Sequence, residues 1–137
     1  MRVVYPVIFT ETKDEKDTVL AYVPDLDRST EGYGIADAIV MAKDLIGNMI
    51  FDVPDPELPK PTKANGINPG KSPFHGDGES FVSLVDVDLD AFRTREKSKS
   101  VRRNITLPQW LDDMATDAKL NVSAITQAAL KKELGIA

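Results

Sequence analysis

Two groups of carboxylates are the side chains of this sequence whose type and spacing could support catalysis. They are Asp25, Asp27 and Glu31 in the first group and Asp86, Asp88 and Asp90 in the second. Carboxylates gathered around two metal ions drive phosphodiester cleavage in many nucleases. Acidic residues at turns and strand ends are, however, usually solvated. A metal-dependent nuclease is therefore the alternative interpretation of this sequence and not the leading one.

Other catalytic and metal-binding chemistry has little support in the sequence. The 137 residues include no cysteine and a single histidine, His75, which excludes thiolate metal sites, cysteine nucleophiles and multi-histidine metal sites. The segment from Asp86 to Asp90 starts like a calcium loop, but Ala91 and Lys97 stand where glycine and a bidentate glutamate are required. We therefore expect no metal, no cofactor and no enzymatic activity. Because no apolar run approaches the ~18 residues that span a bilayer, we also expect a cytoplasmic protein without a membrane partner.

The formal net charge of −5 hides an uneven distribution of charge along the chain. Residues 1–90 contain 8 Lys/Arg and 17 Asp/Glu, whereas residues 91–137 contain 9 Lys/Arg and 5 Asp/Glu. An acidic module repels nucleic acid and a basic module attracts it. The sequence thus predicts two modules, residues 1–90 and 101–137, joined by a basic linker at residues 91–100.

Residues 101–107 alternate in the manner of a short β-strand. Since successive side chains of a strand point to opposite faces, Arg102, Asn104 and Thr106 share one face. Their chemistry suits base edges, because Arg pairs with guanine, Asn pairs with adenine, and Thr contacts a hydrogen-bonding group or the thymine methyl. Arg103 falls on the other face, where its stem packs and its charged head reaches phosphate or solvent.

Two helices are predicted after this strand, one starting near Pro108 and one capped by Ser123, with Asn121 ending the first. A strand and two helices in under 40 residues bury too little apolar surface to fold alone. Pairing the strand with its own copy across a two-fold axis would supply the missing partner. The side chains that we expect this dimer to bury are Ile105, Leu107, Leu111 and Leu130.

This arrangement resembles a ribbon-helix-helix DNA-binding domain, in which two strands from two chains form an antiparallel ribbon. The DNA major groove is ~12 Å wide and accepts such a ribbon. The backbone amides near Val122, Ser123 and Ala124, at the start of the second helix, would hold a DNA phosphate. Lys97 and Lys99 would contact phosphates without reading the base sequence.

The acidic module has the pattern of an α+β domain in the order β-β-β-α-loop-β, with the helix covering one face of the sheet. Gly34 is an acceptable cap for the helix, and Asp37 suits its positive N-terminal end. Pro6 cannot donate a ladder hydrogen bond, so we expect it on the unpaired side of an edge strand. The predicted elements are strands at residues 2–10, 18–23, 28–33 and 81–87 and an amphipathic helix from Ile35.

Residues 52–80 are predicted to form a long loop. They contain six of the nine prolines and four of the eight glycines, a composition that opposes both helix and sheet. Loops of this length are usually functional or mobile. Two interpretations stay open, an extended arm that contacts a partner protein and a mobile loop without a partner.

Several motifs of the acidic module resemble the antitoxin family HicB. The resemblance covers roughly residues 4–50, with the strand at residues 81–88 as its continuation, and it implies a partial RNase H-like fold. HicB proteins join this domain to a C-terminal DNA-binding domain of helix-turn-helix or ribbon-helix-helix type, and the present chain resembles the second kind. The motifs are Tyr5-Pro6-x-x-Phe9, Tyr22-Val23-Pro24-Asp25-Leu26, Thr30-x-Gly32 and an alanine-rich helix with Ala38 and Ala42.

The resemblance implies the antitoxin of a type II toxin–antitoxin system. Its N-terminal domain would bind and block a HicA-type toxin, a small ribonuclease that cleaves mRNA with a catalytic histidine. Its C-terminal domain would bind operator DNA as a homodimer or higher even oligomer and repress its own operon. The acidic charge of residues 1–90 independently suits a basic RNA-cleaving partner. The alternative function is a metal-dependent RNase H-like nuclease that uses the N-terminal carboxylates.

Overall fold

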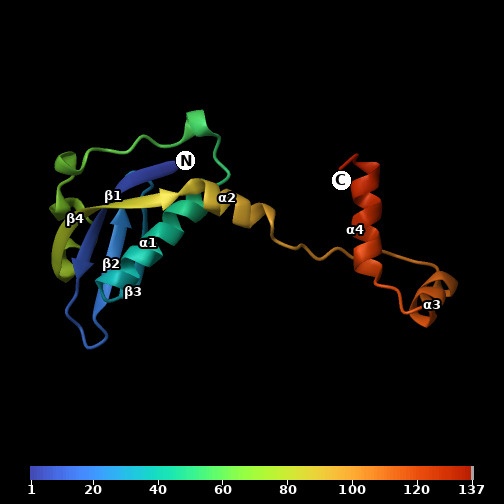
Figure 1. Ribbon diagram of the computed structural model, residues 1–137. Coiled ribbons are helices and arrows are strands. Elements are labelled where there is room, and N and C mark those ends of the chain that lie inside the picture. The colour runs from blue at the N-terminus through green and yellow to red at the C-terminus, as the bar shows by residue number, and fades with distance from the viewer. Residues whose placement is uncertain (137) are drawn as a thin grey trace. The chain divides into compact units, whose positions relative to one another are not determined.

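The computed structural model describes residues 1–136 and divides them into two compact units, residues 1–99 and 100–136 (Figure 1). Each unit is described by itself below. No helix among residues 1–136 is long and apolar enough to cross a membrane.

The first unit contains the four strands that the sequence predicts. They are β1 (Arg2–Glu11), β2 (Thr18–Val23), β3 (Arg28–Tyr33) and β4 (Glu79–Asp88). Together they form one antiparallel sheet with the strand order β3-β2-β1-β4. β1 is the central organising strand, because it pairs with β4 over all ten of its residues and with β2 from Ile8 to Glu11.

Pro6 lies in an inner strand, which corrects the expectation that it belongs to an edge strand. It is opposite Leu84 of β4, and the pairing of β1 with β2 begins only at Ile8. Proline lacks the amide hydrogen that a fully paired strand would use. The sheet therefore accommodates Pro6 at a place where β1 has a paired strand on one side only.

Helix α1 (Ile35–Ile50) packs on one face of the sheet, as predicted. Gly34 precedes it with a φ of 86°, a conformation that favours glycine. Asp37 accepts a hydrogen bond from the Tyr33 amide at 2.8 Å and lies at the positive end of the helix. Burying each large apolar side chain contributes ~1.5–3 kcal/mol. The core between helix and sheet includes Tyr5, Val7, Phe9, Ala38, Ala42, Ile46 and Ile50.

Residues 52–78 form an irregular segment, here called the covering segment. In Figure 1 it passes (green) from the end of α1 over the end of the sheet that lies away from the β1–β2 turn. Its third and fourth 3-10 turns approach β4 and β1, respectively. Pro6, Ile8 and Thr10 point to the face opposite α1 and are also buried. The expected loop is confirmed, and its 3-10 turns are Asp55–Glu57, Ala64–Gly66, Pro69–Lys71 and His75–Asp77.

A second helix, α2 (Leu89–Lys97), occupies most of the segment for which the sequence predicts a basic linker. Asp88 caps the helix by accepting a hydrogen bond from the Ala91 amide at 3.2 Å. The Phe92 ring lies against Gly47 of α1, so closely that a Cβ on Gly47 would lie 2.4 Å from the ring. The linker prediction was wrong because a nine-residue basic helix lacks the repeating apolar pattern that reveals longer helices.

The second unit contains two helices, α3 (Gln109–Asp117) and α4 (Val122–Glu133). Pro108 precedes α3, as the sequence predicts. Two details of the break between the helices differ from the prediction. Lys119, with a φ of 53°, has the left-handed conformation expected of Asn121. Asn121 caps α4 by accepting a hydrogen bond from the Ala124 amide at 3.1 Å, a role expected of Ser123.

Residues 101–107 form no β-strand within the single chain. The predicted strand pairs with its copy in a second chain, so it stays a prediction. A lone strand has no ladder for its amide and carbonyl groups, so its formation requires a second strand. None of residues 100–136 is buried. A unit of this size without a buried core lacks the apolar burial that stabilises an independent domain.

An alanine at position 47 tests the docking of α2 on α1. Alanine normally stabilises a helix interior by ~0.5–1 kcal/mol relative to glycine. Here the Phe92 ring must move to make room, so we expect Gly47→Ala to lower the free energy of unfolding. Urea unfolding of Gly47→Ala, Phe92→Ala and the double variant measures the coupling. Equal effects of Gly47→Ala with and without Phe92 would contradict this packing.

Candidate functional site

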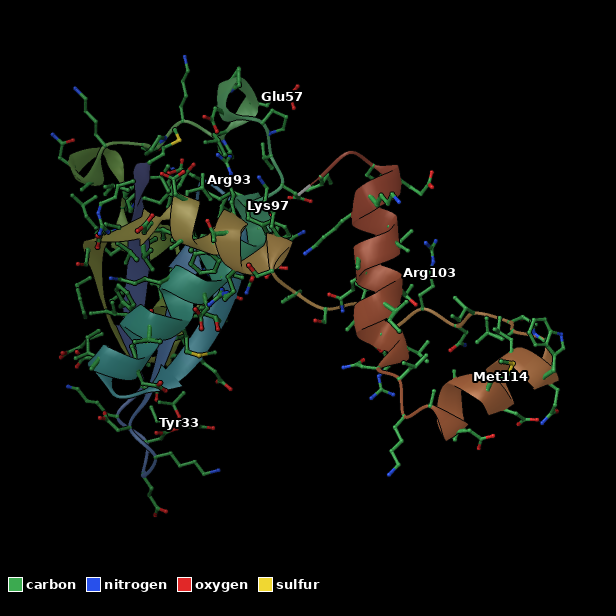
Figure 2. The ribbon with its side chains drawn as sticks, turned by 45° about the vertical axis from the view of Figure 1, so that its right-hand side comes forward. Tyr33, Glu57, Arg93, Lys97, Arg103 and Met114 are labelled. Carbon is green, nitrogen blue, oxygen red and sulfur yellow. The ribbon has the colours of Figure 1, made fainter. Side chains whose placement is uncertain are left out.

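The six basic residues between positions 93 and 103 do not form one uniform DNA-binding patch. Arg93 donates hydrogen bonds at 3.0 Å to the carbonyls of Phe51 and Val53 and pairs with Asp55 at 2.7 Å. It therefore holds α2 to the end of α1 and the start of the covering segment. Figure 2 shows Arg93 and Lys97 on α2 in the first unit.

Two more of these basic residues have partners within the first unit. The Arg95 guanidinium lies 4.4 Å from the centre of the Phe92 ring, in a cation–π arrangement. Lys99 pairs with Glu96 at 2.9 Å. Among the residues that the structure describes, Lys97, Arg102 and Arg103 form no ion pair.

Because α2 belongs to the first unit, its basic residues count toward the net charge of that unit. Residues 1–99 contain 12 Lys/Arg and 18 Asp/Glu, a net charge of −6. Residues 100–137 contain 5 Lys/Arg and 4 Asp/Glu, a net charge of +1. The second unit is thus nearly neutral as a whole. Its positive charge at the predicted DNA-binding strand comes from Arg102 and Arg103 alone.

The predicted base-reading residues Arg102, Asn104 and Thr106 are all exposed. They lie on extended chain, so the single chain does not fix them on one face. Ser123 is the second residue of α4, where helix amides lack partners within the helix. The Ala124 amide, which the sequence assigned to phosphate binding, is occupied by the Asn121 side chain.

The residues predicted to form the dimer contact are apolar side chains left open to solvent in the single chain. Ile105 is 54% exposed, Leu130 is 53% exposed and Leu111 is 39% exposed. Leu107 is half-buried. Other large apolar side chains of the second unit, including Met114 in Figure 2, are exposed as well. Such a concentration of exposed apolar surface marks a site of association.

The first carboxylate group has structural partners. Asp25 accepts hydrogen bonds from the Thr62 amide at 3.0 Å and the Thr62 hydroxyl at 2.6 Å. It therefore holds the covering segment to the turn after β2. Asp27 accepts a hydrogen bond from the Tyr22 hydroxyl at 2.7 Å, which raises the pKa of Tyr22.

The second carboxylate group also has structural partners. Asp86 pairs with Arg2 at 3.0 Å and with Lys43 at 3.4 Å, and Lys43 is the main cause of its lowered pKa. Asp90 pairs with the N-terminal amine, which lowers its pKa. A general acid or base works best with a pKa near the operating pH. These carboxylates are instead held in the ionised form.

The carboxylates do not combine into a metal centre in the part of the chain that the structure describes. No group of three or more Asp, Glu or His side chains there is placed to hold a metal ion. The polar contacts of Asp25 and Arg93 were not apparent from the sequence. Their partners lie 37 and up to 42 residues away, beyond the reach of local pattern.

This chain is similar to chains of known structure. No family model matches the sequence, and no curated protein matches it. A chain of a toxin–antitoxin complex from Streptococcus pneumoniae has a TM-score of 0.61 and 27% identity, covering 97% of this chain and 99% of that one. The antitoxin HicB from Burkholderia pseudomallei has a TM-score of 0.50 and 20% identity, covering 97% of both chains. The fold is HicB-like. At 97% coverage both alignments include residues from both units.

Loss of the Asp25 carboxylate should release part of the covering segment. Thr62 loses two hydrogen bonds in Asp25→Ala, so we expect its amide to exchange with solvent roughly tenfold faster. Hydrogen exchange followed by NMR measures this change. Asp27→Ala is the matched control, because Asp27 bonds to Tyr22 and not to the covering segment. Unchanged exchange at Thr62 in Asp25→Ala would contradict the contact.

Proposed function

We propose that this chain is the antitoxin of a type II toxin–antitoxin system and acts in the cytoplasm without enzymatic activity of its own. The observation that carries the proposal is the 27% identity over 97% of the chain with a chain of the toxin–antitoxin complex. An alignment that includes both units supports a protein with two functional parts.

The first unit is proposed to bind a HicA-type toxin directly and to block its cleavage of mRNA. A ribonuclease that holds RNA carries positive charge, and the net charge of −6 on residues 1–99 complements it. Complementary charge raises the rate and specificity of association more than the affinity. The toxin would thus be steered to this unit and not to the nearly neutral second unit.

The second unit is proposed to form a ribbon-helix-helix homodimer, or the basis of a higher even oligomer. In it, residues 101–107 of two chains would pair as an antiparallel ribbon. The support is the absence of buried residues from position 100 to 136, together with the exposure of Ile105, Leu111 and Leu130. Burial at ~25 cal/mol per Å² of apolar surface then favours association.

Operator DNA is the proposed ligand of this dimer, and its binding would repress the operon that encodes the chain. Arg102, Asn104 and Thr106 would read base edges, because strand pairing would place them together on one face. The phosphate contacts would come from Arg103, Lys97, Lys99 and the amide of Ser123.

The nuclease alternative has less support. Asp25, Asp27, Asp86 and Asp90 each bond to a group of this chain, and so are not available together to metal ions. Magnesium-dependent RNA cleavage by the purified chain, abolished by Asp25→Asn, would favour the nuclease.

Truncation after Lys99 should separate the two proposed activities. This cut preserves α2, whereas a cut after Asp90 would remove the Phe92 and Arg93 contacts that hold the first unit together. We expect residues 1–99 to have a lower oligomeric state than the full chain, measured by light scattering, and to lose DNA binding. They should still bind the protein encoded in the adjacent reading frame, inactivated at its catalytic histidine. Failure of the full chain to bind that protein would overturn the proposed toxin binding.

Replacement of Asn104 tests the proposed base contact. Asn104→Ala should cost ~1–3 kcal/mol at the specific operator and relax the preference at one base position per half-site. Lys97→Ala should weaken binding to all DNA sequences nearly alike and should make the affinity less dependent on salt concentration. Gel-shift titrations at several salt concentrations distinguish the two effects. Asn48→Ala, on exposed α1 surface, is the matched control. An unchanged base preference in Asn104→Ala would make Arg103 the first base-contact candidate.

A further inference from the structure

The outer edge of β4 is a long strand edge without a partner. All ten residues of β4 pair with β1 on one side. Within the described chain, the backbone of residues 79–88 has no hydrogen bond to any other segment on its other side. An edge of this kind presents a row of free amide and carbonyl groups, to which another extended chain can pair.

The middle of β4 lacks the features that usually protect an edge strand, because its charged residues, Glu79, Asp86 and Asp88, lie toward the two ends. Protected edges are short or carry lysine, proline or a bulge. The register from Arg2–Asp88 to Glu11–Glu79 is continuous, so β4 has no bulge. Residues 80–85 contain neither charge nor proline. The opposite edge of the sheet, β3, differs because it has six residues, among them the exposed Arg28 and Glu31.

Apolar side chains flank this edge on both faces of the sheet. Leu84 is 57% exposed on the face opposite α1, next to Val4, which is 39% exposed. Phe81 is 38% exposed on the α1 face and stacks on Phe9 at 5.7 Å. An added strand would therefore gain backbone hydrogen bonds together with apolar contacts on both faces.

We propose that the outer edge of β4 pairs with an extended strand of the basic toxin, so that the toxin extends this sheet by β-strand addition. This inference rests on the proposed function, and it names the surface of the first unit that the toxin uses.

Charge favours a basic partner over a second copy of this chain. Residues 79–90 contain four acids and no basic residue. Three of these acids already pair within the chain, Glu79 with Lys13, Asp86 with Arg2 and Lys43, and Asp90 with the N-terminal amine. The charge argument therefore rests on the unit as a whole, whose net charge of −6 includes these ion pairs. That charge repels a second copy of the unit and attracts a basic partner.

Single prolines at successive positions of β4 test the proposal whichever of its amides point outward. Successive amides of a strand point alternately to its two sides. The series is Val82→Pro, Ser83→Pro and Leu84→Pro. A proline that replaces an inward-pointing amide removes a hydrogen bond to β1 and lowers Tm. A proline that replaces an outward-pointing amide removes only a hydrogen bond that a partner strand would make. The probe is the protein encoded in the adjacent reading frame, inactivated at its catalytic histidine.

We expect the prolines that leave Tm nearly unchanged to weaken binding of this probe about tenfold or more. The matched controls are Ser29→Pro and Thr30→Pro on β3, of which the stable one should bind like the wild type. Normal binding by every stable β4 proline variant overturns the strand addition and leaves the proposed function intact. No binding by the wild type overturns both. Light scattering without the probe gives the mass of each assembly. If the stable β4 variants form smaller assemblies than the wild type and the β3 controls do not, a second copy of this chain is the occupant and the proposal is overturned.

Discussion

Strand β1 is the constraint on which the first unit depends, because it is paired along one side for its full length and buried on both faces. Tyr5, Val7 and Phe9 face α1, while Pro6, Ile8 and Thr10 face the opposite side of the sheet. A sheet buried on one face only would need no covering segment. Because β1 is apolar on both faces, part of residues 52–78 has to lie against the second face. The Asp25–Thr62 and Tyr5–Pro59 hydrogen bonds help to hold the covering segment to the rest of the first unit.

The arrangement around β1 also explains where the sheet remains open. α1 packs on one face, and the covering segment approaches β4 and β1. The outer edges of the sheet offer a partner free backbone groups in addition to the side chains that stay exposed on both faces. β3 closes one edge with a short, charged strand, while β4 leaves ten residues unpaired on its outer side. Residues 52–80, for which a partner-binding arm and a mobile loop were both open, thus have a structural role within their own chain.

The second unit differs from the first because residues 100–136 form no buried core. Its helices have caps and breaks that are well defined locally, yet no residue between 100 and 136 is buried. Local hydrogen bonds fix each helix, but burial is what stabilises a domain. This lack of a buried core is an argument for a homodimer. In the proposed homodimer, the predicted DNA-reading strand would lie at the two-fold axis.

The sequence by itself determined the elements that depend on neighbouring residues. The four strands, α1 and the helices after Pro108 and Asn121 follow from alternation, helical spacing and capping residues, all within a few positions of one another. Only the tertiary structure decided what depends on distant partners. α2 formed where a linker was predicted because Phe92 packs on Gly47 and Arg93 bonds to Phe51 and Val53, which lie 42 and 40 residues away from it. The carboxylates that suggested a nuclease became structural for the same reason, since Asp25 has its partner 37 residues away in the covering segment. Contacts at such separations are set by how the elements pack, and no local pattern encodes them.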